Sequence, residues 1–187
     1  MDTTCQCLHP GLANDAPTLR PANDGDIPFI TEIYNEQIRT SVGLFLNHEV
    51  SEENRLAWLR DLQKGAYPCV VVEVDEVRED GVRSKRTIGW CNIGRYRSKA
   101  AYDATAEISL YIHRDFRGRG LGSLLLGSVV AEARSRKFHT LLAMVTAQNT
   151  DSCRFWGKHG WGQAGVTREV GWKFNQWLDV VTYQIIL

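Results

Sequence analysis

The sequence predicts a single-domain α/β (α+β) protein, with a mixed central β-sheet flanked by helices, in residues 18–187. Two amphipathic helical patterns and a β-rich hairpin come first. A strand, a glycine-rich loop and a helix follow, and β-rich runs end the chain. The length of 187 residues suits one domain with a sizeable core, and no internal repeat or linker interrupts it.

The composition excludes several classes of protein. Twenty-two basic and 22 acidic side chains cancel, so no overall field would gather nucleic acid or an anionic membrane. No apolar run reaches the length of a membrane span, and the N-terminus lacks the pattern of a signal peptide. We therefore expect a cytoplasmic protein that binds neither nucleic acid nor membrane.

The five cysteines are expected to be free thiols. Their number is odd, and their spacing matches neither a disulfide framework nor a zinc ribbon. Cys5, Cys7 and His9 lie in residues 1–17, which mix polar residues with Gly and Pro without a hydrophobic period. This stretch predicts a disordered tail, so we expect no metal site.

Two helices are expected in the first third of the chain. Thr18–Pro21 can form a short strand, and Asp24 or Asp26 then caps the first helix. The second helix opens at Ser51 and ends at Gly65. The apolar faces contain Ile27, Ile30, Tyr34 and Ile38 in the first helix and Leu56, Leu59 and Leu62 in the second.

The rest of the chain is expected to be rich in strands. Strands are predicted at Cys69–Val74, Thr87–Ile93, Ala106–Ile112, His139–Thr146, near Val166–Val170 and at Leu178–Ile186. The first two form a hairpin with Asp80-Gly81 at its extended tip. Helical patterns run from Ser123 to about Arg136 and from Thr150 to Lys158.

The stretch Arg117-Gly118-Arg119-Gly120-Leu121-Gly122, between a strand and a helix, predicts an anion site. Glycine lets the backbone turn sharply and approach a ligand, and the following helix offers unpaired N–H groups and the positive end of its dipole. The N–H groups from Gly118 through Ser123 can converge on a pyrophosphate, with Arg117 and Arg119 adding charge.

Two other phosphate-binding motifs do not fit this spacing. A Walker loop needs a Gly-Lys-Ser/Thr ending, which follows neither Gly120 nor Gly122. A dinucleotide fingerprint needs G-x-G-x-x-G, but here the next glycine comes one position too soon. The following strand also ends, near Thr146, without a carboxylate to hold a ribose. For the loop alone, a surface turn that caps a core helix is the remaining alternative.

The pattern Arg-x-x-Gly-x-Gly resembles motif A of the GCN5-related N-acetyltransferases (GNAT), in which this loop binds the pyrophosphate of acetyl-coenzyme A. Other stretches resemble the phosphinothricin and methionine sulfoximine N-acetyltransferase group. They are Tyr34-Asn35, Tyr67-Pro68, Ala101-Tyr102, Glu107, Leu110-Tyr111-Ile112, Gly171-Trp172-Lys173-Phe174 and Trp177-Leu178-Asp179-Val180. The resemblance covers residues 18–187 and implies direct, acetyl-CoA-dependent N-acetylation of a small amino-acid-like amine, without a metal.

The resemblance also implies roles for single residues. An alkyl ammonium must lose a proton before it attacks, and Glu107 stands where the family places its carboxylate base. The backbone of Leu110, Tyr111 and Ile112 would run beside the pantetheine arm, where an N–H can polarise the thioester carbonyl. Asn149 matches a cofactor-contacting asparagine. A solvent-facing strand carboxylate and a simple helix N-cap are the structural alternatives for Glu107 and Asn149.

One departure from the family keeps a second function open. Related enzymes carry tyrosine or histidine where this chain has Trp156, and indole is not an acid at neutral pH. Protonation of the leaving thiolate would then fall to water or another residue, and a non-catalytic acyl-CoA-binding sensor or scaffold is the alternative. A relay through Cys153 is weaker, because His159 lies six residues further on and on another helix face.

Substrate recognition is expected from a basic and aromatic segment. Arg97 and Lys99 beside Tyr102 would suit the carboxylate and the oxidised side-chain head of a small amino acid, and a solvated basic loop is the alternative. Phe45, in the irregular segment 40–49, completes the expected set.

A homodimer is implied by the same resemblance. The aromatic end of the chain adds to this expectation, because it offers more apolar surface than a small monomer leaves exposed. Its rings are Trp161, Trp172, Phe174 and Trp177. The alternative is that all four rings are internal.

Overall fold

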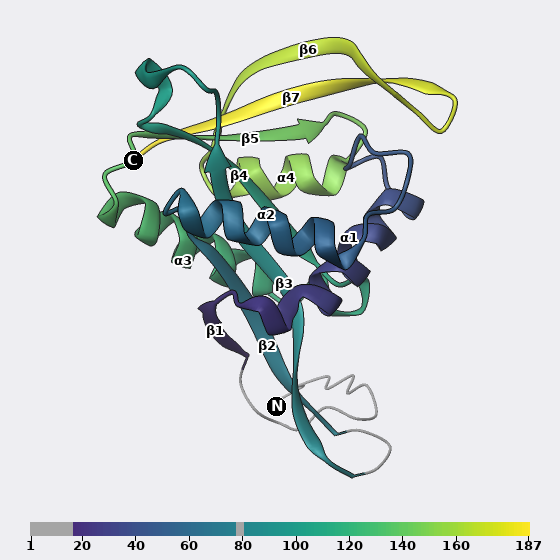
Figure 1. The fold of residues 1–187 in the computed structure, drawn as a ribbon. Helices are drawn as coiled ribbons and strands as arrows, with labels where there is room; N and C mark the ends of the chain where they lie inside the picture. Colours follow the sequence, from purple (N-terminus) through teal and green to yellow (C-terminus); the bar gives the residue numbers. More distant parts are fainter. Residues whose placement is uncertain (1–16, 78–80) are drawn as a thin grey trace, which may run out of the picture.

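The computed structural model describes residues 17–77 and 81–187. The expected tail up to residue 16, with Cys5, Cys7 and His9, and Asp80 of the expected turn lie outside the described residues. The described residues form one mixed seven-stranded sheet with helices on both faces (Figure 1). This arrangement confirms the predicted fold class.

The elements follow the predicted order, and most strands are longer than predicted. The strands are β1 (Thr18–Pro21), β2 (Cys69–Val77), β3 (Arg83–Arg95), β4 (Thr105–Ile112), β5 (Thr140–Thr146), β6 (Gly162–Lys173) and β7 (Gln176–Ile186). The helices are α1 (Ile27–Thr40), α2 (Glu52–Lys64), α3 (Leu121–Ser135) and α4 (Thr150–Lys158), with short 3-10 turns η1 (Asp24–Asp26), η2 (Ala100–Tyr102) and η3 (Arg114–Phe116). The bounds of α4 match the prediction.

The ends of the first two helices follow local hydrogen-bonding chemistry. Ser51 caps α2 by accepting a hydrogen bond from the backbone N–H of Asn54, and Gly65 ends that helix, as predicted. Asp26, one of the two predicted caps of the first helix, occupies the N-cap position of α1, but its side chain makes no capping hydrogen bond. Asn23 caps the η1 turn instead, and the carboxylate of Asp26 does not cap α1 because it binds Arg20 at 2.8 Å and Thr87 at 2.6 Å.

The centre of the sheet opens between β4 and β5. These strands pair in parallel over three positions, of which Glu107 opposite Leu142 is the last. Beyond that pair β4 continues against β3, and β5 continues against β7, so the two central strands diverge (Figure 1). On the sides that face each other, the diverging parts of β4 and β5 therefore have backbone groups with no strand to pair with. An extended ligand can lie in the gap between them and bond to those groups.

The two faces of the sheet bury separate hydrophobic clusters. One cluster contains residues of α3 and α4, and β4 contributes Ala106 and Ile108 to it, with Leu110 and Ile112 packed against it. The other contains residues of α1 and α2 and is contacted by Tyr111. Because side chains alternate along a strand, Glu107 shares the α1 and α2 face with Tyr111.

The β6–β7 hairpin turns on two residues that are not glycine. Phe174 and Asn175 have φ values of 50° and 59°, as the central positions of a tight hairpin turn require. The predicted strand Val166–Val170 is only the middle of β6, which bulges near Glu169, where φ is 47°. Trp161 lies before this hairpin and is 4% exposed, so the expectation that it adds to the apolar surface is wrong.

Across residues 17–77 and 81–187, the structure contains no helix that combines the length and the hydrophobicity needed to cross a membrane.

Candidate active site

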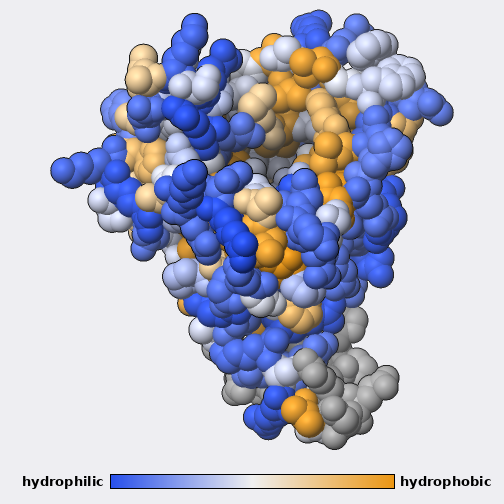
Figure 2. All heavy atoms as spheres, viewed as in Figure 1, coloured by the Kyte–Doolittle hydropathy of each residue, from blue (hydrophilic) through white to orange (hydrophobic). Residues whose placement is uncertain are grey.

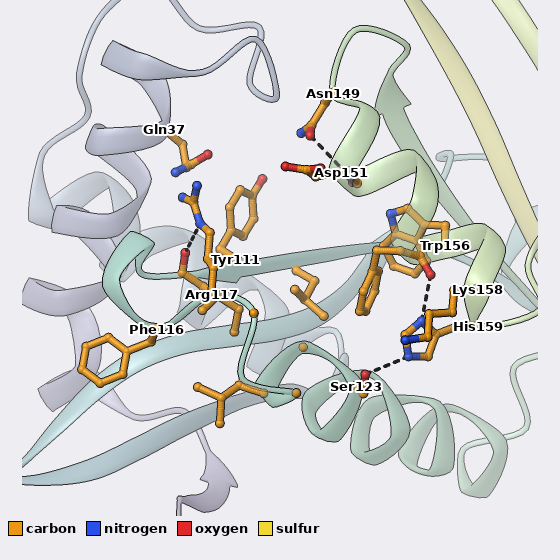
Figure 3. A pocket seen from close by; sticks show the side chains of 18 of the residues that line it. Gln37, Tyr111, Phe116, Arg117, Ser123, Asn149, Asp151, Trp156, Lys158 and His159 are labelled. Carbon is orange, nitrogen blue, oxygen red and sulfur yellow. Dashed lines mark hydrogen bonds between the residues drawn. The ribbon is translucent and has the colours of Figure 1, made fainter. Parts of the chain in front are cut away.

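A groove of about 460 Å³ lies between the end of β4, the start of α3 and the inner side of α4 (Figure 3). Ten of the eleven predicted cofactor residues line it: Leu110, Tyr111, Ile112, Arg117, Gly118, Gly120, Leu121, Gly122, Ser123 and Asn149. The fold thus brings residues from three separate segments to one surface. Their binding roles stay predictions.

The glycine loop leaves its ligand-facing side open. Gly118 and Gly120 have φ values of 73° and 79°, and a Cβ added to either would meet no atom within 4 Å. The α3 helix has no acidic residue in its first turn and no side-chain cap. Its first N–H groups and its positive dipole end are therefore available to an anion in the groove.

Gly122 serves a different purpose from the two loop glycines. A Cβ at this position would lie 3.1 Å from Cε2 of Phe155, which is closer than a comfortable carbon contact. The absence of a side chain lets α4 pack against the first turn of α3. Because that contact sets the width of the groove, Gly122 is a packing residue as well as a lining one.

The two arginines of the loop lie differently. Arg117 lines the groove, and its Nε donates to the carbonyl oxygen of Ile112 at 3.1 Å (Figure 3). Arg119 does not line the groove, because it donates to the carbonyl oxygen of Asp115 at 2.8 Å and its guanidinium lies 5.2 Å from the centroid of the Phe116 ring. The structure therefore gives no support to a cofactor contact by Arg119.

Several lining residues were missed by the sequence reasoning. Asp151, Phe155 and His159 repeat every four residues on α4 and form its groove-facing side, a spacing that could have revealed them. Gln37 and Ser41 reach the same groove from the end of α1, and no local pattern marks that long-range contact. Figure 3 shows Gln37 on the opposite side of the groove from α4.

Asn149 caps α4, which was the structural alternative to a cofactor contact. Its Oδ1 accepts a hydrogen bond from the backbone N–H of Ser152 at 3.2 Å. Because the residue also lines the groove, capping and ligand contact are compatible roles for it. Ser152 lines the groove too.

A smaller pocket of about 100 Å³ continues the groove into the splay between β4 and β5. The pocket is lined by Ile108 to Tyr111 of β4, Ala143 to Thr146 of β5, Gln37 and Gly43 from α1 and the segment after it, and Asn149, Ser152 and Trp156 of the α4 region. Trp156 is 3% exposed and belongs to the core, and it also lines the pocket. Figure 2 shows a hollow with hydrophobic residues around it on the α1 and α2 face of the molecule.

Glu107 stands at the inner end of this splay. It is half-buried, and removal from water raises the pKa of its carboxyl group. It shares a sheet face with Ser109, which lines the inner pocket about 7 Å further along the strand. A carboxylate with a raised pKa is a better proton acceptor than an ordinary one, which suits a general base.

The segment that follows α1 is attached to the sheet by hydrogen bonds from two strand residues. Nζ of Lys173 donates to the carbonyl oxygens of Ser41 and Leu44 at 2.8 and 2.7 Å, and Thr146 Oγ1 donates to that of Val42 at 2.7 Å. Lys173 is 3% exposed, and burial lowers its pKa. These contacts fix the residues between α1 and Phe45, which form one wall of both cavities.

Lys173→Met tests this anchoring. The change keeps an unbranched apolar stem of similar length but leaves the carbonyl oxygens of Ser41 and Leu44 without their donor. We expect the free energy of unfolding to fall by about 1–3 kcal/mol, the cost of unpaired buried polar groups. Chemical denaturation measures it, with Lys64→Met at an exposed position as the control, expected within about 0.5 kcal/mol of the parent. Equal losses in the two variants would contradict the anchoring.

The predicted substrate residues are not brought into either cavity. The guanidinium of Arg97 lies 5.0 and 5.7 Å from the ring centroids of Tyr96 and Tyr102, and Lys99 is exposed. This aromatic and basic cluster precedes β4 and so lies at the Glu107 end of the strand, away from the glycine loop. Phe45 packs on Gly171, where a side chain would collide with its ring.

Cys153 has no histidine partner in the described structure. Its Sγ lies 3.8 and 3.9 Å from the carbonyl oxygens of Thr146 and Ala147. The ring nitrogens of His159 bond to Phe155 and Ser123 instead. Nothing in this arrangement would convert the thiol into a nucleophile.

Known proteins share this fold and this sequence pattern. The L-methionine sulfoximine/L-methionine sulfone acetyltransferase of Salmonella typhimurium is 34% identical over 170 residues, which are 91% of this chain and 94% of the relative. The phosphinothricin N-acetyltransferase of Alcaligenes faecalis is 32% identical over 174 residues, covering 92% and 84%. The solved structure of yncA from Salmonella typhimurium with its cofactor acetyl-CoA matches with a TM-score of 0.82 and 33% identity, covering 92% and 95%.

The fold and these similarities define an acyltransferase. Residues 29–161 match the model of the acetyltransferase (GNAT) family, and the chain belongs to that family.

Proposed function

We propose that the protein transfers the acetyl group of acetyl-CoA to the amino group of a small amino acid of the methionine sulfoximine, methionine sulfone or phosphinothricin type. One observation carries the proposal. The open, uncapped start of α3 adjoins a groove that continues into a small pocket at the β4–β5 splay, and the half-buried Glu107 lies at the inner end of that splay, one residue before the pocket wall begins at Ile108. The names of the relatives support the acceptor class.

The groove offers a place for the pyrophosphate of coenzyme A and for its pantetheine arm. The free N–H groups of Leu121 and Gly122, together with Arg117, would hold the pyrophosphate, and the open space beside Gly118 and Gly120 admits it. The exposed edge of β4 at Leu110 would run beside the pantetheine arm. When bound, acetyl-CoA supplies the activated acetyl group as a thioester.

The chain's own residues then perform three tasks. Glu107 takes the ammonium proton of the acceptor, directly or through one water, and leaves the amine nucleophilic. A backbone N–H at the splayed end of β4, near Leu110, stabilises negative charge on the carbonyl oxygen. Direct transfer needs no enzyme nucleophile. This agrees with the surroundings of Cys153, whose Sγ contacts the carbonyl oxygen of Thr146 and no histidine in the described structure.

Protonation of the leaving thiolate is left to water in this proposal. Trp156 carries no acidic proton near neutral pH. Tyr111 also lines the pocket, but burial raises the pKa of its phenol, so it keeps its proton and makes a poor acid. A thiolate of moderate pKa leaves without such help.

The acceptor would enter from the α1 and α2 face, where the hollow in Figure 2 lies. The inner pocket of about 100 Å³ admits only small groups. In the proposal, Arg97 and Lys99, which lie outside both cavities, attract the carboxylate of the acceptor as it approaches, with Tyr102 and Phe45 as apolar neighbours of its path. The protein is proposed to act in the cytoplasm, where its free thiols, Cys69, Cys91 and Cys153, stay reduced.

A panel of amines tests the proposal. The protein is incubated with acetyl-CoA and methionine sulfone, methionine sulfoximine, phosphinothricin, unmodified methionine or a simple alkylamine, and thiol release is followed. We expect the three oxidised or phosphinic amino acids to give the highest kcat/KM and the alkylamine, which lacks a carboxylate, the lowest. Binding of acetyl-CoA without thiol release for any amine would favour the sensor or scaffold, the function that Trp156 keeps open.

We also propose a homodimer that covers the end of the β6–β7 hairpin. Trp172, Phe174 and Trp177 are 52%, 52% and 56% exposed, and the two tryptophan rings pack together at 5.1 Å. Such a patch is large for a small monomer. Light scattering at micromolar concentration is expected to give twice the mass of the chain, and Trp177→Glu to give the monomer. A monomeric parent would contradict the dimer.

A further inference from the structure

Ser123 and His159 form a hydrogen-bonded pair in the wall of the groove. Nε2 of His159 lies 2.9 Å from Oγ of Ser123, and Nδ1 lies 2.8 Å from the carbonyl oxygen of Phe155 (Figure 3). Both residues line the groove, one from the first turn of α3 and one from the end of α4. The pair thus adjoins the helix start that would hold an anion.

The partner of Nδ1 fixes the hydrogen on the imidazole ring. A carbonyl oxygen only accepts, so Nδ1 carries a hydrogen in both charge states of His159. In the neutral ring Nε2 is then an acceptor, and the hydroxyl of Ser123 must donate to it. In the charged ring Nε2 donates to Ser123 Oγ, and the serine hydrogen is released to another acceptor.

The charges around the ring favour an anion at this place. Lys158 of α4 and Arg117 of the loop line the same groove, and the first turn of α3 holds no acidic residue. The acidic residue among the lining side chains is Asp151, whose carboxylate lies 3.3 Å from the guanidinium of Arg154. The other face of the imidazole packs on the ring of Phe155 at 4.3 Å.

We propose that Ser123 and His159 form a proton-linked binding pair for the pyrophosphate of coenzyme A. The inference rests on the proposed function, because it assigns a role in the same groove. Protonation of His159 turns the Ser123 hydroxyl from a donor to imidazole into a donor to a phosphate oxygen, and it adds a positive charge beside the anion. Binding and protonation therefore strengthen each other by the same factor.

The sign of the pH dependence follows from this linkage. Bound coenzyme favours the protonated ring of His159, so affinity is highest at acidic pH and falls as the pH rises and the ring loses its proton. We expect a change in affinity of about tenfold between the two limits. The proton taken up at acidic pH is bound by the imidazole ring of His159, and Ser123 keeps its hydroxyl hydrogen throughout.

Calorimetric titration with 3′-dephospho-CoA from about pH 5 to 8 tests the pair, because a histidine titrates in this range. This probe has the pyrophosphate but no phosphomonoester, whose second pKa of about 6 would add a pH dependence of its own. The parent is expected to bind about tenfold more tightly at the acidic end. His159→Gln should give a nearly flat profile, and Ser123→Ala should lose most affinity at the acidic end.

His139→Gln is the matched control, because His139 is an exposed histidine outside the groove, and it should keep the profile of the parent. Proton NMR of the unmodified protein gives a second readout, in which the His159 resonance should titrate at higher pH when the coenzyme is bound. Parallel profiles for the parent and His159→Gln, or an unmoved resonance, would overturn the pair and leave the proposed function standing. No coenzyme binding at any pH would overturn both.

Discussion

Glu107→Gln should lower turnover by about a hundredfold or more at neutral pH, while the affinity for acetyl-CoA stays nearly unchanged. Glutamine keeps the shape and the hydrogen-bonding reach of glutamate but cannot accept the ammonium proton. The coenzyme groove is lined by the end of β4 from Leu110 onward, the glycine loop, α3 and α4, and Glu107 is not among its lining residues. Steady-state kinetics combined with coenzyme titration separates the two quantities.

The pH profile distinguishes a base from a structural carboxylate. High pH supplies free amine without help from the enzyme, so the rate of Glu107→Gln should climb toward the pKa of the substrate, whereas the parent levels off earlier. Profiles of the same shape at different amplitude would remove Glu107 from the mechanism.

Stability gives an independent readout for the same variant. The pKa of Glu107 is raised in the folded protein, so the folded chain holds the carboxyl proton more tightly than the unfolded chain does. The resulting contribution to stability is present below the unfolded pKa and is lost as the pH rises through the folded pKa. At neutral pH the buried charge opposes folding, and Glu107→Gln should unfold at the same or a slightly higher denaturant concentration than the parent.

Gly120→Asp is the second change with a large expected effect. A carboxylate at this position would stand in the open space of the cradle, where like charges in contact cost several kcal/mol, so coenzyme affinity should fall by about a hundredfold or more. Its backbone has a φ of 79°, which an L-residue adopts with some strain. Calorimetric titration with CoA measures the loss.

Gly127→Asp is the matched control for this variant. It adds the same charge inside α3, the helix that Gly120 precedes, at an exposed position where a Cβ meets no atom within 4 Å. The control should bind coenzyme like the parent, although both variants lose some helix stability or gain some strain. Equal affinities for Gly120→Asp and Gly127→Asp would show that the loop does not bind the pyrophosphate.

The parts of the fold that local chemistry determines were predictable from the sequence. Residue periodicity and caps located the helices, as Ser51, Gly65 and the bounds Thr150–Lys158 show. The glycine loop was identified because glycines before a helix start allow a sharp turn, and Gly118 and Gly120 have the positive φ that such a turn uses.

Features that depend on distant segments were not predictable. The β6–β7 turn places Phe174 and Asn175 at positive φ, where a glycine would have marked it. Lys173 binds the carbonyl oxygen of Ser41, 132 positions away, and no local pattern encodes such a contact. Arg119 resembled an anion ligand by composition, but the η3 turn offers its guanidinium a carbonyl oxygen and an aromatic ring outside the groove.

A single-turnover experiment tests direct acetyl transfer most directly. The protein, in excess over acetyl-CoA labelled in its acetyl group, is mixed with methionine sulfone and quenched at short times, and both the small molecules and the intact protein are weighed by mass spectrometry. The account predicts that label leaves the thioester and enters the amino nitrogen at the same rate, with the mass of the protein unchanged throughout. Label that first accumulates on the protein, at Cys153 or elsewhere, or that never leaves the thioester, would contradict it.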